Sequence, residues 1–562
     1  MLLQFAQALI PLALLYLTKL IVDSITEFKE TGDFQTILTY ILIFGGMQLI
    51  SAIIQNYHQL ITESQSQLVS DYMATVIIDK AITVDISYYE NSSYYNTFHQ
   101  AQRQALYRPV QILRNLSDLL KNIFLLASLA GLLFFLHWSI ALILVFFALP
   151  IAGVKWYFSK QMFIWEKNRT ELEREAAFLN LVLTSDNYAK EVRIFGLGKR
   201  LLDKFIKVRK ALFNEKFNIA NQRAKAGTFA KGAEIIAMTA SFSFIAWRAF
   251  TGAITIGDLV MFFQAFQRGQ AAIQQSLSSL VGLYDNRLFL SHLFELLKVK
   301  PLIASPEVPE KILPLAHGIK LKNVNFKYPG TEKLVLKNIN LDFKKGDVVA
   351  LVGENGSGKT TLLKLLCRLY DPTNGIIERD EKDIKKYNLE ELRKRITVIY
   401  QDFSIYQFSV AENIQIGDYE KSDAYTQTVI AAQRSGANEF IESFPKKYKQ
   451  TLGRWFEDGQ ELSGGQWQKI ALARAFYKDA EIIVLDEPSS AIDPLAEAEI
   501  FARFKEMAKD KILVLITHRL YNLKMADQIV VLNKGEISEV GDHEQLINNS
   551  QLYKSMFEKQ VN

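Results

Sequence analysis

The chain has 562 residues, of which 49% are hydrophobic and 22% charged, so it is long enough for roughly three or four domains and too apolar to be disordered. Its net charge is only +5 and no dense basic arm is present, so no nucleic-acid partner is expected. A single cysteine, Cys367, excludes an intramolecular disulfide, and the seven histidines lack metal-ligand spacing, so no structural zinc site is expected.

The first 285 or so residues contain apolar runs long enough to cross a membrane, because about 20 helical residues span the hydrocarbon core of a bilayer. We predict six membrane helices, at Leu2–Val22, Ile37–Tyr57, Leu116–Leu136, Ser139–Tyr157, Phe229–Phe250 and Ile256–Leu277. The first run has no basic leading segment or cleavage site, so we expect a retained span in contact with lipid rather than a signal peptide. No domain is expected ahead of it.

The sixth run is the least apolar. Four glutamines fall within about 120° of one another around its axis; they are Gln264, Gln267, Gln270 and Gln274. Because amides facing lipid are costly, we expect them either to line a polar cavity or to make interhelical hydrogen bonds. Arg268 interrupts the same run, and an intramembrane cation usually has a partner or a functional role.

The distribution of basic residues predicts the orientation in the membrane. Between Lys160 and Lys225 there are 15 Lys and Arg against 8 Asp and Glu. The short connections near Glu27–Phe34 and around His137–Trp138 carry only one basic residue, Lys29. The positive-inside rule therefore places the long connections, both termini and the carboxyl-terminal half in the cytoplasm.

The two long connections, about Ile61–Asn115 and Phe158–Gly227, keep the helical spacing of apolar residues. We expect membrane helices that continue into the cytoplasm. Aromatic and turn-forming residues interrupt the first connection near Tyr88–Thr97, which indicates either a short docking element or an ordinary helical hairpin turn. The basic amphipathic segment Ala189–Leu201 in the second is either a docking element or a solvated helix.

Four prolines between residues 298 and 318 predict an extended linker, which separates a membrane domain at 1–297 from a second domain at 319–562. In the second domain, short runs rich in valine and isoleucine alternate with helical runs. These strands are Val348–Val352, Ile396–Ile399, Ile482–Leu485 and Ile512–Ile516. This alternation is typical of an α/β fold with a largely parallel sheet.

A phosphate-binding loop of the form G-x-x-x-x-G-K-[ST] follows the first of these strands and opens a helix. Glycine-rich backbone N–H groups and a helix amino terminus together bind phosphates. The predicted nucleotide-binding residues of this loop are Gly353, Glu354, Asn355, Gly356, Ser357, Gly358, Lys359, Thr360 and Thr361. We expect Lys359 to reach the β- and γ-phosphates of ATP and Thr360 to bind Mg²⁺.

The strand Ile482–Leu485 ends in Asp486 and Glu487. An acid at the carboxyl end of a buried strand is typical of the second half of such a site. We expect Asp486 to hold Mg²⁺ and Glu487 to orient or deprotonate the attacking water.

Ser463-Gly464-Gly465-Gln466 lies about twenty residues before Asp486 and opens a helix. Ser463 alone fits a helix N-cap. Between the phosphate loop and the Asp-Glu strand, however, the sequence resembles the signature of ATP-binding cassette (ABC) proteins. That resemblance implies that the signature binds ATP.

The remaining cassette motifs are found where the resemblance implies them. Tyr328 matches the aromatic residue that stacks on adenine, and Gln401 the glutamine that links Mg²⁺ and the attacking water to the membrane domain. Asp493 matches a loop that crosses the cassette dimer interface, and His518 the histidine that contacts the γ-phosphate. Asp458 departs from the family, since many relatives carry a basic residue there.

Six spans followed by one cassette resemble an ABC exporter half-transporter over essentially the whole chain. The resemblance implies that two chains dimerise and that the signature of each completes the ATP site of the other. Since all required groups are present, we expect a homodimer, with pairing to a different half-transporter as the alternative. The extensions would dock, near Tyr88–Thr97 and Ala189–Leu201, on the surface around Gln401.

The resemblance also implies ATP-driven export across the cytoplasmic membrane, with ATP and Mg²⁺ as cofactors. The segments Tyr88–Asn91 and Ala189–Leu197 resemble bacterial exporters of lantibiotics and related peptides, so a peptide is the expected substrate. Its leader would be trimmed by another protein. The alternatives are a multidrug or lipid exporter that moves amphipathic small molecules, and, against the evidence of six spans, a membrane-tethered cassette ATPase without transport.

Overall fold

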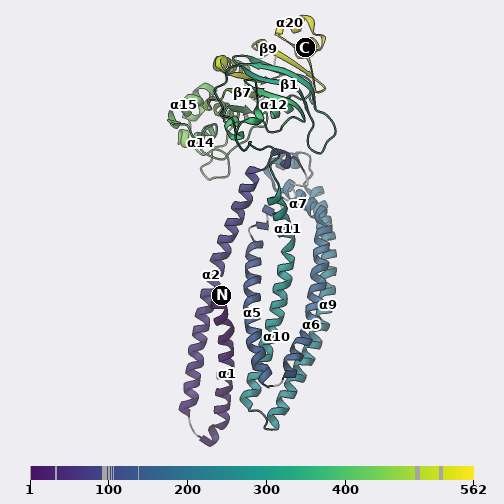
Figure 1. The fold of residues 1–562 in the computed structure, drawn as a ribbon, viewed down its shortest axis with the longest axis vertical. Helices are drawn as coiled ribbons and strands as arrows, with labels where there is room; N and C mark the ends of the chain where they lie inside the picture. Colours follow the sequence, from purple (N-terminus) through teal and green to yellow (C-terminus); the bar gives the residue numbers. More distant parts are fainter. Residues whose placement is uncertain are drawn as a thin grey trace. The chain divides into compact units, whose positions relative to one another are not determined.

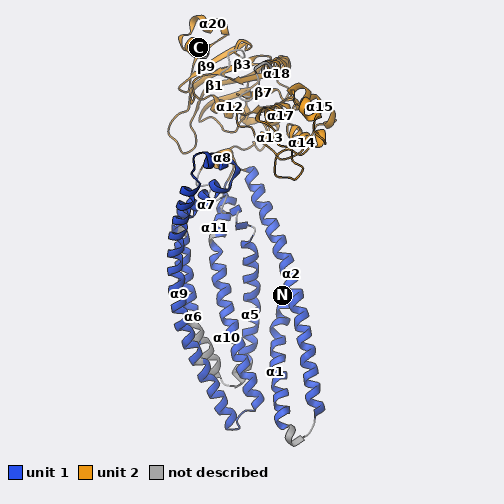
Figure 2. Ribbon diagram, turned by 180° about the vertical axis from the view of Figure 1, so that it is seen from behind, with its two compact units in different colours: residues 1–83, 92–299 blue, residues 84–91, 300–562 orange. Residues whose placement is uncertain are grey.

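A computed structural model gives the fold of the chain (Figure 1) and describes all residues except 1, 32–33, 92–97, 99–100, 103, 106, 137, 488–493, 518–522 and 562. The chain divides into two compact units (Figure 2). The first contains Met1–Thr83 and Ser92–Val299, and the second contains Val84–Asn91 and Lys300–Asn562. The short segment Val84–Asn91 thus belongs to the second unit, although long helices of the first unit precede and follow it in the sequence.

The first unit is built from long helices, as the sequence predicts. They are α1 (Leu2–Thr31), α2 (Phe34–Thr83), α5 (Arg108–Leu136), α6 (Trp138–Asn168), α9 (Gly198–Phe250) and α10 (Ile256–Asp285). Each of the six predicted spans lies inside one of them. Within the described residues, three helical stretches are long and apolar enough to cross a membrane by length and composition alone, at Leu3–Glu27, Phe34–Thr83 and Gly198–Phe250.

Several of these helices are much longer than a bilayer requires. At about 1.5 Å per residue, the 50 residues of α2 span about 75 Å, against about 30 Å of hydrocarbon. Shorter helices, α7 (Thr170–Thr184) and α8 (Asp186–Ile194), connect α6 to α9, and α11 (Arg287–Lys298) follows α10. The prediction that the long connections continue as helices is therefore confirmed.

Helix α10 packs against α1, α5, α6 and α9. Its buried face includes Met261, Phe262 and Ala265, which contact Leu15 of α1 and Ile245 of α9 in one apolar cluster. A capping box begins the helix: Thr255 accepts a hydrogen bond from the N–H of Asp258, whose carboxylate accepts one from the N–H of Thr255.

The second unit contains two sheets. A four-stranded antiparallel sheet has the order β2-β1-β4-β5 and a six-stranded sheet the order β10-β9-β3-β8-β7-β6. Their bounds are β1 Gly318–Phe326, β2 Leu336–Lys344, β3 Val348–Val352, β4 Asn374–Arg379, β5 Lys382–Asp383, β6 Ile396–Ile399, β7 Ile482–Asp486, β8 Ile512–Ile516, β9 Gln528–Asn533 and β10 Glu536–Gly541.

The larger sheet confirms the predicted parallel α/β core, because β9, β3, β8, β7 and β6 are parallel and only β10 runs antiparallel. The smaller sheet was not predicted. Every residue of β3, β7 and β8 is buried, whereas β1 and β2 alternate buried with exposed residues. The larger sheet could be predicted because its buried strands are continuous apolar runs. The half-exposed strands of the smaller sheet contain no such run.

The second unit also contains short and medium-length helices among its described residues. They are α3 (Ile86–Tyr89), α12 (Lys359–Leu366), α13 (Leu389–Lys394), α14 (Val410–Gln415), α15 (Ala424–Ser435), α16 (Asn438–Glu442), α17 (Gly464–Tyr477), α18 (Pro494–Met507), α20 (His543–Asn549), α21 (Gln551–Val561) and three short 3₁₀ turns at Ile384–Lys386, Lys447–Lys449 and Ala508–Asp510. Helices α14, α15, α16, α17, α18, α20 and α21 contribute to one apolar core together with strands of the parallel sheet.

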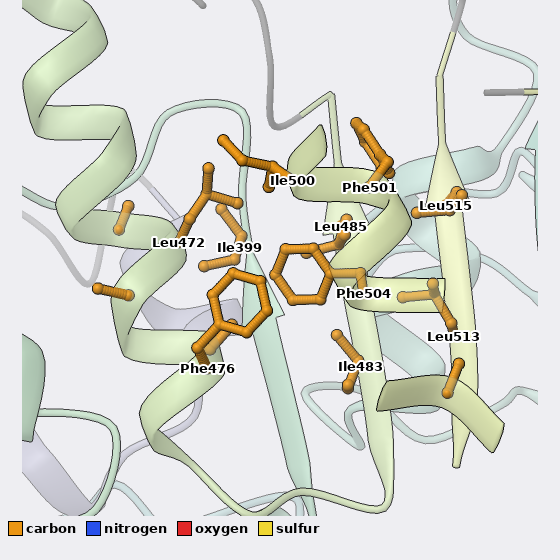
Figure 3. Close-up of a cluster of buried hydrophobic side chains, with 14 of the residues drawn as sticks. Ile399, Leu472, Phe476, Ile483, Leu485, Ile500, Phe501, Phe504, Leu513 and Leu515 are labelled. Atoms are coloured by element: carbon orange, nitrogen blue, oxygen red, sulfur yellow. The ribbon is translucent and has the colours of Figure 1, made fainter. Parts of the chain in front are cut away.

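Figure 3 shows this core. The rings of Phe476 from α17 and Phe504 from α18 stack with centroids 4.0 Å apart, beside Ile483 and Leu485 of β7. Burying an aromatic side chain of this size stabilises a fold by about 3 kcal/mol. The packing anchors β7, whose carboxyl end carries Asp486.

Candidate nucleotide site

The predicted phosphate loop joins the buried strand β3 to helix α12. Gly353 and Gly358 have φ values of +154° and +111°, in the region that favours glycine. A Cβ on Gly353 would lie 2.3 Å from the carbonyl oxygen of Leu532, and one on Gly358 would lie 2.7 Å from Cδ2 of Leu336. Close packing against β9 and β2 therefore requires glycine at both positions.

The side chain of Lys359 lies inside this loop. Its residue is only 8% exposed, and its Nζ donates hydrogen bonds to the carbonyl oxygens of Gly353 at 2.7 Å and Glu354 at 3.1 Å. Burial lowers the pKa of the ammonium, while Glu487 and Asp486 act in the opposite direction. A buried cation enclosed by a loop is suited to bind an anion of several charges.

Ser357 supports the same assignment. Its hydroxyl oxygen is buried and finds no hydrogen-bond partner among the residues that the structure describes. Buried polar atoms are nearly always paired, so an orphan here indicates a missing partner. Phosphate oxygens would accept from this hydroxyl and from the loop amides. The loop therefore fits the β- and γ-phosphates of a nucleotide.

Asp486 and Glu487 lie at the carboxyl end of β7. Asp486 is 6% exposed, and burial together with the charge of Glu487 raises its pKa to about 6, against the opposing effect of Lys359. Glu487 has a φ of +44°, which is uncommon for a residue other than glycine, and its N–H donates to the carbonyl oxygen of Ile516 at 2.9 Å. Two adjacent acids beside the buried ammonium suit a cation-dependent site.

We expect Asp486→Asn to stabilise the nucleotide-free protein at neutral pH. Since the pKa of Asp486 rises to about 6, the native state binds a proton between pH 4 and 6 that the unfolded chain has released, and stability falls as the pH rises through this window. Asparagine removes this penalty, discounted here to roughly 1–2 kcal/mol. Thermal unfolding at pH 5 and pH 7.5 without Mg²⁺ checks the prediction, with Asp342→Asn, at a half-exposed carboxylate paired with Lys320, as the control. A lower melting temperature at pH 7.5 would contradict it.

The signature segment begins helix α17. The hydroxyl of Ser463 accepts from the N–H of Gln466 at 3.3 Å, and the N–H of Ser463 donates to Oε1 of Gln466 at 2.9 Å. This capping box satisfies the free amides of the first turn. Ser463 and Gly464 are exposed, and Gly465 is half-buried. The segment thus has both the predicted N-cap role and a surface open to a ligand.

Tyr328 follows strand β1 and is half-buried. Its hydroxyl lies 3.0 Å from Oγ1 of Thr361 in α12, and its ring meets those of Phe326 and Tyr370 edge to face. These contacts connect Tyr328 to the helix that starts at the phosphate loop.

The structure brings only part of the predicted site together. The loop residues, Asp486 and Glu487 gather around Lys359. Thr360 is exposed in the first turn of α12, directly after Lys359, whereas Gln401 lies on an exposed turn elsewhere in the sequence. Asp493 and His518 lie outside the described residues, so their predicted roles stay predictions. No cluster of three or more His, Cys, Asp or Glu side chains occurs in the described part of the chain, so a metal here would need ligands of other kinds.

Comparisons with known proteins agree with this geometry. Residues 1–269 match the family described as ABC transporter transmembrane region, and residues 336–490 match ABC transporter. The subtilin transport ATP-binding protein SpaT of Bacillus subtilis is 32% identical over 98% of this chain and 89% of its own length. The chain belongs to the ABC transporters. Its cassette hydrolyses ATP to drive export, and the chain is a membrane protein with a cytoplasmic ATP-binding domain.

Two further likenesses extend over the whole ABC transporter. The nisin transport ATP-binding protein NisT of Lactococcus lactis subsp. lactis is 30% identical over 98% of this chain and 91% of its own length. A solved structure of a bacterial Atm1-family ABC exporter with ATP bound has a TM-score of 0.82 at 22% identity, covering 100% of this chain and 98% of that one. The predicted exporter fold is thereby confirmed.

The membrane unit of the transporter contains a cavity of about 540 Å³ between α9 and α10. Its lining combines apolar, amide and cationic side chains, namely Phe242, Leu259, Val260, Phe263, Gln264, Gln267 and Arg268. The ring centroids of Phe242 and Phe263 lie 4.5 Å apart. Arg268 is partly buried, and its guanidinium has no hydrogen bond or ion pair to any described residue. The cavity can thus take a ligand with apolar and anionic parts.

Gln270 and Gln274 have a different role from Gln264 and Gln267. Both donate to Oε1 of Glu234 on α9, Gln274 at 2.5 Å. Of the two expected alternatives, lining a cavity therefore holds for Gln264 and Gln267. Interhelical hydrogen bonding holds for Gln270 and Gln274. Glu234 and Lys155, whose Nζ donates to Oγ of Ser278 at 2.6 Å, were missed by the sequence analysis. Both residues could have been found in the sequence, because each is a charged residue inside a predicted membrane helix, and such a residue usually has a partner there.

Proposed function

We propose that the chain exports a peptide of the lantibiotic kind, as a homodimer with two equivalent ATP sites. The observation that carries the substrate class is the likeness, over almost the whole chain, to two transport proteins that are named for subtilin and nisin. The observation that carries the ATP site is the buried ammonium of Lys359 enclosed by the glycine loop, beside two carboxylates.

In this proposal each residue of the nucleotide site has one role. The amides of the loop, Ser357 and Lys359 bind the β- and γ-phosphates, and Tyr328 stacks on adenine. Glu487 accepts the proton of the attacking water, and His518 donates to the γ-phosphate. Ser463 and Gly465 contact the ATP held by the other chain.

Thr360, Gln401 and Asp486 would hold Mg²⁺, which prefers such oxygen ligands together with phosphate and water. The raised pKa of Asp486 fits this role, because a bound cation would favour the ionised carboxylate. Mg²⁺, when bound, neutralises negative charge on the β- and γ-phosphates.

Two ATP molecules between two cassettes favour their closure. Closure can drive the membrane helices only if the inward- and outward-facing arrangements differ in their affinity for ATP. Hydrolysis of ATP, with Glu487 as the base, removes the nucleotide contacts that hold the two cassettes together and so resets the cycle. The extended helices α2, α6 and α9 provide the mechanical connection to the membrane.

We assign the cavity between α9 and α10 to the substrate. Replacing Arg268 by glutamine should raise the substrate concentration for half-maximal stimulation of ATP hydrolysis about tenfold, because a charge-assisted hydrogen bond contributes roughly 1.5–3 kcal/mol. Dose–response curves in lipid vesicles check this, with Arg223→Gln, on the exposed face of α9, as a matched control. Unchanged stimulation and unchanged transport in Arg268→Gln would remove the cavity from the transport path.

ATP hydrolysis in vesicles tests the whole proposal. The full-length chain and Glu487→Gln are compared across lantibiotic precursor peptides, amphipathic drugs and lipids. Stimulation by the peptides alone, absent in the variant, supports a peptide exporter that needs no second kind of chain. Stimulation by drugs or lipids alone would instead establish the multidrug or lipid alternative. A folded wild type without any hydrolysis would indicate a missing partner half-transporter.

A further inference from the structure

The segment Val84–Asn91 is fixed within the nucleotide unit by contacts on its own residues. Asp85 accepts hydrogen bonds from the backbone N–H groups of Leu302 and Ile303. Tyr88 donates through its hydroxyl to the carbonyl oxygen of Lys300 at 3.1 Å. The segment is therefore attached to the first residues of the linker that leads into the cassette.

Glu90 extends this attachment to helix α12. Its carboxylate accepts from Nζ of Lys364 at 2.7 Å and from the hydroxyl of Tyr370 at 2.6 Å. Burial would raise the pKa of Glu90, but these two hydrogen bonds lower it overall. Burial and the neighbouring Glu90 also raise the pKa of Tyr370, so its hydroxyl stays a neutral donor. Glu90 is thus ionised and doubly bonded at neutral pH.

Lys364 also contacts the proposed adenine site. Its Nζ lies 5.3 Å from the ring centroid of Tyr328 and 5.7 Å from that of Tyr370, within the range of a cation–π interaction. It lies on α12, the helix that begins at Lys359. One ammonium is therefore shared between the carboxylate of Glu90 and the face of Tyr328.

We propose that Glu90 and Lys364 are positioning residues that hold the ring of Tyr328 for the base of the nucleotide and so couple base binding to docking of Val84–Asn91. This inference rests on the proposed adenine role of Tyr328. Lys364 lies over the ring of Tyr328, whose edge-to-face contacts with Phe326 and Tyr370 fix it from two further directions. Since coupling between two sites is reciprocal, whatever docking contributes to base binding, the bound base contributes equally to docking.

The described contacts of this segment add a second surface to the expected one around Gln401. The hydrogen bonds of Asp85, Tyr88 and Glu90 that the structure describes go to the linker, to α12 and to Tyr370. Residues 92–97 lie outside the described residues, so docking around Gln401 stays a prediction. Through Lys364, the segment Val84–Asn91 reaches the ring of Tyr328.

The test compares ATP with inorganic tripolyphosphate, which occupies the phosphate loop but has no base. In full-length protein in lipid vesicles, Glu90→Gln should raise the KM for ATP about three- to tenfold, with kcat and the inhibition constant of tripolyphosphate within about twofold of the wild type. Lys364→Gln should raise the KM at least as much as Glu90→Gln, because it also removes the cation from the ring of Tyr328. The double variant should raise the KM no further than Lys364→Gln alone, since both changes act through the same ammonium.

A matched control removes a similar ion pair elsewhere in the unit. Glu310 lies 2.7 Å from Nζ of Lys382 and has no described hydrogen bond to Tyr328 or Lys364, so Glu310→Gln should leave the KM for ATP unchanged. Hydrogen exchange reports docking directly: ATP should slow exchange at Leu302 and Ile303 more than tripolyphosphate does. This difference should vanish in Glu90→Gln.

The possible failures are distinguishable. Tyr328→Ala should lose the preference for ATP over tripolyphosphate. If Tyr328→Ala loses this preference but Glu90→Gln keeps it, Tyr328 binds the base but Glu90 is not coupled to it. If Tyr328→Ala keeps the preference, the adenine assignment is wrong and the coupling falls with it. If kcat, KM and the tripolyphosphate constant all change together in Glu90→Gln, Glu90 has only a general structural role.

Discussion

Replacing Glu487 by glutamine should slow ATP hydrolysis by a factor of about 10²–10⁴ while ATP still binds. The glutamine keeps the size of the side chain but cannot accept a proton from the attacking water. Binding should persist because the loop, Ser357 and Lys359 are untouched. Phosphate release under saturating Mg-ATP measures the first effect, and equilibrium binding of labelled ATP measures the second.

The control for this variant is Glu420→Gln, which removes an exposed carboxylate paired with Lys394 and should hydrolyse ATP like the wild type. Hydrolysis near the wild-type rate in Glu487→Gln would show that another group accepts the proton. Asp486→Asn distinguishes the two acids, since it should weaken Mg²⁺-dependent binding as well as hydrolysis. A variant that binds ATP but does not turn over is therefore expected at position 487 and not at 486.

The sequence determined the nucleotide loop because its chemistry depends on residues that are adjacent in the chain. Gly353 and Gly358 are required by backbone geometry at fixed spacing from Lys359, and the strand before the loop is a continuous apolar run. Asp486 could be predicted for the same reason, since a buried strand places its last residue at the sheet edge.

Contacts between distant residues could not be predicted in this way. Glu90 and Lys364 are 274 positions apart, and nothing in the pattern around either residue identifies its partner. The glutamines of α10 show a related limit: a helical wheel gives the direction of each side chain but not the neighbour found there. Only the position of Glu234 on α9 separates Gln270 and Gln274 from Gln264 and Gln267.

Site completion by the second chain predicts a specific result for mixed dimers. Lys359→Ala removes the ammonium from the loop, and Ser463→Arg places a bulky cation on the exposed signature. As homodimers, both variants should be inactive, because in each dimer every site contains one damaged component. In a dimer of one variant with the other, both lesions fall in the same composite site if the signature acts on the partner's ATP. The second site then keeps an intact loop and an intact signature.

The mixed dimer should therefore recover about half of the wild-type hydrolysis if the two equivalent sites act independently. Differently tagged chains are co-expressed, and the mixed dimers are isolated by two successive affinity steps. The matched control pairs Lys359→Ala with Glu487→Gln, which damages one component of each composite site and should stay inactive. If Ser463→Arg instead acted on the ATP bound to its own chain, the first pair would be as inactive as the control. Recovery in the first pair alone thus requires that each ATP be held between two chains, and a single chain then cannot turn over ATP at a complete site.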